Sequence, residues 1–201
     1  MVVHRMPIRS NNSDAALLLL ELHTQCMLIS RSFEYLCEAA IHWKNISNGI
    51  DDGRIYPPIE IVARCTVYLS GMTAIRNLLF ENKRKKPIII NRCSALKGLL
   101  GHPNLPILSS TLVRNSWEHL DERLDNILPT NRGHPIEPIR IAPGKPDPND
   151  LSIKRFDPND ISIWFLNQRI SLPDCQLEIE LISKRIDEAF NLLQVQHYRI
   201  Y

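Results

Sequence analysis

The sequence predicts a mainly α-helical protein, an antiparallel bundle of four to five helices with a small C-terminal antiparallel β-hairpin or meander. Three observations predict this fold. Apolar residues recur at helical spacing over most of the first 128 residues, prolines gather between positions 129 and 148, and a ten-residue repeat with strand-like alternation follows. The 201 residues fit a single domain, 1–201, which is long enough to bury a substantial core.

The first predicted helix begins at Ser13 and Asp14, residue types that cap helix N-termini, and continues without glycine or proline to Asn48. Gly49 then suits the left-handed conformation that commonly ends a helix. The apolar residues recur at three-, four- and seven-residue spacing and therefore mark one stripe. They are Leu18, Leu22, Ile29, Phe33, Leu36 and Ala40.

A second helix is expected from Pro57 and Pro58 to about Glu81, because proline suits the first turn of a helix. The loop before it is short, so the two long helices should lie antiparallel. A basic turn follows, then a short helical stretch over 94–100 and a further helix from about 109 or 110 to 128. Residues 13–128 are therefore expected to form the helical bundle core.

The composition changes after residue 128. Six prolines between 129 and 148 exclude a regular helix and predict a Pro-rich connection over 129–150. Asp147–Ile153 is then echoed by Asp157–Ile163, each copy being a turn sequence followed by alternating residues. We expect short strands at 151–156, 161–166 and 169–172 within a β-hairpin insertion, 151–172. A last helix, 173–195, should pack on the bundle.

Composition and charge give expectations about the partner and the location of the protein. The 24 basic and 22 acidic side chains give a net charge of +2, so global charge does not indicate a nucleic-acid or membrane partner. Five cysteines, an odd number without any CxxC spacing, indicate reduced thiols. The chain has no apolar run long enough for a signal peptide or a membrane-spanning helix. We therefore expect a cytoplasmic protein with no membrane anchor.

One segment, 111–125, is dense in polar and ionisable residues on an otherwise apolar predicted helix. Arg114 and His119 are five residues apart, which separates them by about 140° around a helix axis. Both side chains can therefore border one groove without touching each other. Glu118 lies one turn from Arg114, and Glu122 lies nearly one turn from His119, so we assign these two carboxylates supporting roles.

The pattern Arg114, Asn115 and His119, an arginine, a polar residue and a histidine on a late helix, resembles the signature of the HEPN superfamily. This superfamily consists of small helical ribonucleases of bacterial toxin, antiphage and RNA-guided systems. The resemblance implies metal-independent RNA cleavage by attack of the 2′-hydroxyl on the adjacent phosphorus, which leaves a 2′,3′-cyclic phosphate. It also implies a homodimer that brings two copies of the motif together.

The side-chain chemistry of these residues agrees with catalysis. A histidine, with an ordinary pKa of about 6.5, exchanges protons at neutral pH, which suits His119 as general acid or base. The guanidinium of Arg114 can stabilise charge that develops on a phosphorane, and the amide of Asn115 can orient either group. The chain has no zinc spacing and no pair of Glu-x-x-His motifs, so we expect no metal and no cofactor.

The basic turn Lys83, Arg84, Lys85 and Lys86, extended by Arg92, is the candidate RNA-binding surface. Its alternative interpretation is a solvated turn between helices. The charged helix likewise has an alternative, a surface with local ion pairs or a homodimer contact. The second hypothesis for the whole protein is therefore a non-catalytic interaction or regulatory subunit, antitoxin-like, with a cognate protein partner.

Overall fold

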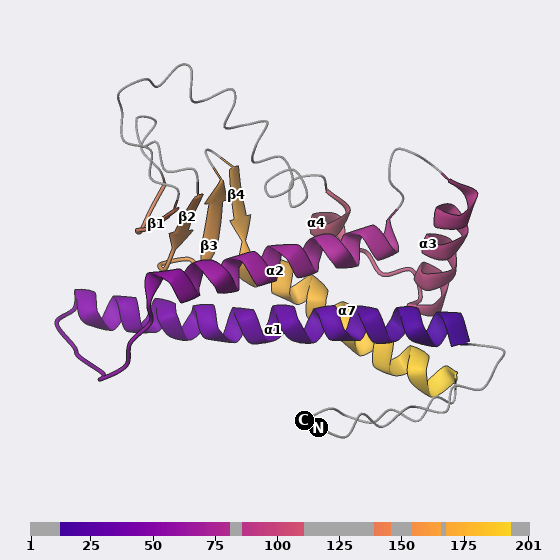
Figure 1. Cartoon of the computed structure of the whole chain (residues 1–201), viewed down its shortest axis with the longest axis horizontal. Helices are drawn as coiled ribbons and strands as arrows, with labels where there is room; N and C mark the ends of the chain where they lie inside the picture. Colours follow the sequence, from indigo (N-terminus) through magenta and orange to yellow (C-terminus); the bar gives the residue numbers. More distant parts are fainter. Residues whose placement is uncertain (1–12, 81–85, 111–138, 146–153, 166–167, 194–201) are drawn as a thin grey trace, which may run out of the picture.

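The computed structural model describes residues 13–80, 86–110, 139–145, 154–165 and 168–193. These residues form five helices and one four-stranded sheet in the C-terminal region (Figure 1). The predicted fold class, mainly helical with a small C-terminal sheet, is therefore confirmed. The sheet differs from the prediction in one respect, because it is mixed rather than purely antiparallel.

Helices α1 (Ser13–Ser47) and α2 (Pro58–Leu79) lie side by side and run in opposite directions (Figure 1). Both were predicted, and α2 ends two residues before the expected Glu81. The helices approach closely at Gly71, where a Cβ atom would lie 2.7 Å from Cγ1 of Ile29. Only a glycine fits this crossing without displacement of the isoleucine.

Helix α3 (Pro87–Leu99) begins seven residues before the predicted stretch 94–100. Its first residue is proline, whose fixed φ and missing N–H suit the first helical position. A short helix, α4 (Pro106–Ser109), follows a reversal at Gly101 and His102, which have φ values of 70° and 51°. The predicted helix from 109 or 110 to 128 lies, beyond residue 110, outside the described residues.

The sheet contains four short strands in the order β1-β2-β3-β4. They are β1 (Ile139–Ile141), β2 (Lys154–Asp157), β3 (Ser162–Phe165) and β4 (Gln168–Ser171). Strands β2, β3 and β4 form the antiparallel meander that the repeat predicted. Strand β1 was not expected, since it lies within the Pro-rich connection and pairs in parallel with β2. The stretch 139–142 is free of proline, which leaves room for this edge strand.

Helix α7 (Leu172–Leu192) follows β4 directly. The side chain of Ser171 caps it by accepting a hydrogen bond of 3.4 Å from the backbone N–H of Asp174. The buried face of α7 packs against α1, and the hydroxyl of Tyr68 in α2 donates a hydrogen bond of 3.0 Å to the carbonyl of Leu172. One apolar cluster therefore includes side chains from the helices and from the sheet.

Candidate functional site

The predicted catalytic residues, Arg114, Asn115 and His119, lie outside the described residues, and so do the two predicted supporting residues, Glu118 and Glu122. The same is true of three residues of the basic turn, Lys83, Arg84 and Lys85. Their assignments stay predictions. The structure does describe the chain that leads into the motif, and it also describes Lys86 and Arg92.

The chain that leads into the motif is held by a buried carboxylate. Glu178 of α7 is only 7% exposed. Its two carboxylate oxygens accept hydrogen bonds of 2.8 Å and 2.9 Å from the backbone N–H groups of Ile107 and Leu108 in α4. The first N–H groups of any helix have no partner within the helix, and Leu105, which precedes α4, provides no side-chain cap. Glu178 therefore caps α4 from a helix 70 residues away in the sequence.

A buried guanidinium fixes the end of the same segment. Arg76 of α2 is 7% exposed, and its Nε donates a hydrogen bond of 3.1 Å to the carbonyl of Ser110. Ser110 precedes Arg114 by four residues. Side chains from α2 and α7 thus fix the chain on the bundle immediately before the predicted motif.

Sequence analysis missed both anchoring residues. Both residues could have been recognised because each is a charged residue beside the buried apolar residues of a helix. Arg76 lies between the buried Ile75 and Leu79, and Glu178 lies beside the buried Ile179. A charge in such a position is stable only when polar partners surround it, and a single sequence does not identify these partners.

The two described residues of the basic turn differ in their surroundings. Lys86 is exposed and precedes the first residue of α3. Arg92 is half-buried, and one guanidinium nitrogen donates a hydrogen bond of 2.7 Å to the carbonyl of Asn77 in α2. Arg92 therefore attaches α3 to α2, while Lys86 is the exposed charge. No acidic residue lies between positions 86 and 110, so the surface of α3 is basic.

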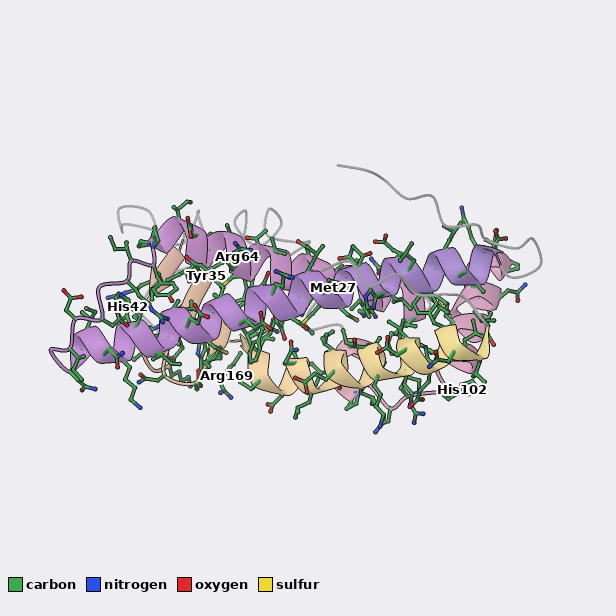
Figure 2. All side chains as sticks on the ribbon, turned by 90° about the horizontal axis from the view of Figure 1, so that it is seen from below. Met27, Tyr35, His42, Arg64, His102 and Arg169 are labelled. Atoms are coloured by element: carbon green, nitrogen blue, oxygen red, sulfur yellow. The ribbon has the colours of Figure 1, made fainter. Side chains whose placement is uncertain are left out.

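A second polar cluster connects α1, the following loop and the start of α2. We name it the tip cluster; it comprises Tyr35, Glu38, His42, Asp52, Arg54, Tyr56, Glu60 and Arg64. Tyr35 donates a hydrogen bond of 2.6 Å to Glu60, and the guanidinium of Arg64 lies 5.1 Å from the centre of the Tyr35 ring. Figure 2 shows Tyr35, His42 and Arg64 in the same half of the molecule.

The loop itself is held by an imidazole and a carboxylate. Nδ1 of His42 lies 2.7 Å from Oδ1 of Asp52, and the ring of Tyr56 packs 5.2 Å from the imidazole. The pKa of Asp52 is lowered, chiefly because the backbone N–H of Arg54 donates a hydrogen bond to its carboxylate and further because His42 lies beside it. The hydroxyl of Tyr56 donates a hydrogen bond of 3.0 Å to Glu38.

A paired histidine and aspartate is also a common element of acid–base sites. Here His42 contacts Asp52 and Tyr56, and neither is a serine or cysteine nucleophile. The contacts of the tip cluster join three consecutive parts of the chain. We therefore interpret it as the framework that orders the loop after α1.

Two further buried charges order the edge of the sheet. Arg155 donates from Nε to the carbonyl of Ala142 at 3.0 Å, and Asp157 accepts a hydrogen bond of 2.7 Å from the N–H of Gly144. These bonds hold the turn after β1. A small apolar hollow lies between α2 and the sheet, where partial burial lowers the pKa of Lys154.

Within the described ranges, no three His, Cys, Asp or Glu side chains come close enough together to hold a metal ion. Nor does any helix in these ranges have the length and apolar character needed to cross a membrane. No protein-family model matches the chain, and no curated protein or solved structure matches it.

Proposed function

We propose that this protein is a metal-independent endoribonuclease of the HEPN type, with Arg114, Asn115 and His119 as its catalytic residues. The observation that carries the proposal is the sequence pattern of these residues, together with its place in the chain. The motif begins four residues after Ser110, which Arg76 attaches to the bundle. The helical fold is the architecture that the resemblance leads us to expect.

In the proposed reaction, the 2′-hydroxyl oxygen forms a bond to the adjacent phosphorus, and the bond from phosphorus to the 5′ oxygen breaks. His119 removes the proton of the attacking hydroxyl as general base. An imidazolium, from the same copy or from the second copy of a homodimer, protonates the departing 5′ oxygen. Arg114 stabilises the negative charge of the phosphorane, and Asn115 orients these groups. The products carry a 2′,3′-cyclic phosphate and a 5′-hydroxyl.

Attraction of the RNA requires positive charge near the motif, because residues 114–126 are net acidic. The basic turn, Lys83 to Lys86, and Arg92 supply this charge in the proposal. The absence of acidic residues from 86 to 110 supports it, since no carboxylate of this stretch opposes the phosphates. A cytoplasmic role in a toxin or antiphage system would follow from such an activity.

The alternative function is a non-catalytic interaction or regulatory subunit, antitoxin-like, that binds a cognate protein. One structural observation favours it. Large apolar side chains are exposed around the loop between α1 and α2, including Ile55 and Ile59 at 84% and 74%. Exposed apolar surface of this kind commonly marks protein interaction sites.

The deciding experiment incubates the purified full-length protein with end-labelled RNA in the presence of a chelator. We expect wild-type protein to produce cyclic-phosphate ends. His119→Ala and Arg114→Ala should each lower the cleavage rate by about 100-fold or more, because each removes a group that acts in the transition state.

Two substitutions outside the motif serve as matched controls. Arg31→Ala removes an exposed arginine of α1, and His102→Asn replaces an exposed histidine by a residue that tolerates its positive φ. Both variants should cleave at the wild-type rate. Cleavage that survives in His119→Ala, or that stops on addition of the chelator, contradicts the proposal. Absence of cleavage by wild-type protein on every RNA tested supports the interaction subunit instead.

A further inference from the structure

One end of the molecule exposes an unusual number of large apolar side chains. The last two turns of α1, the following loop and the first turn of α2 meet at the left end of Figure 1. We name this group of residues the isoleucine tip; it comprises Ile41, Trp43, Ile46, Ile50, Ile55 and Ile59. These six are half of the twelve exposed large apolar residues in the described part of the chain, although they span only 19 positions. Exposed apolar side chains at one end of a molecule are common where a protein binds a partner.

The isoleucine tip is held in one conformation before any partner binds. The tip cluster joins α1 to the loop through His42 and Asp52, and to the loop's end through Glu38 and Tyr56. The backbone N–H of Gly53 also donates to the side chain of Asp51 at 2.9 Å. A surface that is already ordered loses less conformational entropy on binding, so the exposed isoleucines are prepared for association.

The net charge around the isoleucine tip favours a partner of opposite charge. Positions 38–64, which include Arg64 of the tip cluster, contain four acidic residues and three basic residues, which leaves one negative charge in excess. The acidic residues are Glu38, Asp51, Asp52 and Glu60. A matching partner therefore combines exposed apolar side chains with positive charge.

The chain carries such a surface at its opposite end. Helix α3 lies at the right end of the long axis in Figure 1, far from the isoleucine tip. Ile88 in its first turn is 76% exposed and lies two residues from the exposed Lys86. Lys97 adds positive charge, and 86–110 contains no acidic residue. Because the two surfaces lie at opposite ends, they can meet only between different molecules.

We propose that the isoleucine tip of one copy binds the N-terminal half of α3 of a second copy, head to tail. Ile55 and Ile59 would pack on Ile88, and Asp51 would pair with Lys86. The two patches differ, so the contact is heterologous and each bound copy leaves one free tip and one free α3. Association therefore continues into chains or closes into a ring. This proposal does not depend on ribonuclease activity, and a bound second copy would compete with RNA for Lys86.

The test measures the mass of the full-length protein by sedimentation without RNA, from about 1 µM to about 1 mM, the range of modest affinities. The tip variant is Ile55→Asp with Ile59→Asp, and the α3 variant is Lys86→Glu with Ile88→Asp. Three of these positions are strongly exposed, and an aspartate near a helix N-terminus is favourable, so both variants should fold. Circular dichroism checks that they do.

We expect the wild-type mass to grow with concentration and each variant to stay monomeric. An equimolar mixture of the two variants should form a dimer that does not grow further. In the mixture, the α3 variant supplies an intact tip and the tip variant supplies an intact α3. These two surfaces allow one contact and no further growth. Leu177→Asp with Leu192→Asp, at two exposed leucines of α7, is the matched control and should associate like wild type. Added salt should weaken the association.

Three results would overturn the proposal. A wild-type protein that stays monomeric over the whole range leaves no head-to-tail contact. A wild type and an α3 variant that both dimerise, while the tip variant stays monomeric, indicate a symmetric contact of tip with tip. Finally, a monomeric wild type that binds an RNA oligonucleotide, with the binding lost in the α3 variant, assigns α3 to RNA instead of a second copy.

Discussion

The carboxylate of Glu178 accepts a hydrogen bond of 2.9 Å from the backbone N–H of Leu108, and both residues are buried. This bond joins two helices that lie far apart in the sequence. Leu108 also lies two residues before Ser110, in the stretch of chain that leads into the predicted catalytic motif. The stability of this part of the fold should therefore depend on one charged side chain.

Glu178→Ala should lower the free energy of unfolding by about 2–4 kcal/mol, because two buried N–H groups lose a charged acceptor. Glu178→Gln should cost less, since its amide oxygen still accepts one of the two bonds. Urea unfolding followed by circular dichroism measures both changes. Glu180→Ala, at an exposed position of the same helix, should change stability by less than about 0.5 kcal/mol. Equal losses of unfolding free energy in Glu178→Ala and Glu180→Ala would contradict the stabilising role of this cap.

Gly71→Ala should destabilise the protein by about 1–3 kcal/mol, because the new Cβ would lie 2.7 Å from Cγ1 of Ile29. The cost should shrink in an Ile29→Ala background, where that atom is absent, and a double-mutant cycle measures the difference. Gly98→Ala is the control. No atom lies within 4 Å of its added Cβ, so this helical position should gain about 0.5–1 kcal/mol. A neutral Gly71→Ala would contradict the close crossing of α1 and α2.

The five cysteines should differ in reactivity with iodoacetamide at neutral pH. Cys37 is half-buried, whereas Cys26, Cys65, Cys93 and Cys175 are buried. Cys37 should therefore be modified first, at a rate at least about tenfold above the others, as peptide mass spectrometry would record. In concentrated urea all five should react at similar rates. Early modification of Cys65 or Cys175 would show that the core opens more readily than its packing indicates.

Alkaline pH should destabilise the fold through the same thiols. Burial raises the pKa of Cys26, Cys65 and Cys175 from 9.0 to about 12. Unfolded thiols ionise near pH 9, whereas the folded thiols stay protonated until about pH 12. Below pH 9 the thiols are protonated in both states, so the free energy of unfolding does not depend on them. Between pH 9 and pH 12 only the unfolded thiols ionise, which lowers the free energy of unfolding by up to about 1.4 kcal/mol per thiol and pH unit.

Urea unfolding between pH 8.5 and 10.5 tests this slope. Cys65→Ala removes one of the three raised thiols and should reduce the slope by about one third of the thiol contribution. An unchanged slope in this variant would assign the alkaline loss to other groups. The buried Tyr68 is one such group, because its burial also raises its pKa.

The sequence predicted those elements whose signal is local. The apolar stripes and end signals of α1 and α2 placed both helices within two residues of their observed C-terminal ends, and the Asp-Pro-Asn-Asp repeat located the antiparallel meander. The catalytic assignment of Arg114 and His119 rests on the sequence alone. Each of these patterns is contained within a continuous stretch of chain.

Only the tertiary structure decided which distant groups meet. It placed Ile139–Ile141 parallel to β2, Glu178 on the N–H groups of α4, and Arg76 on the carbonyl of Ser110. It also placed the acidic isoleucine tip and the basic α3 at opposite ends. Helix periodicity and turn preference are properties of neighbouring residues and can be read along the chain. Strand pairing and the partners of buried charges depend on contacts between remote segments, which form only when the chain packs.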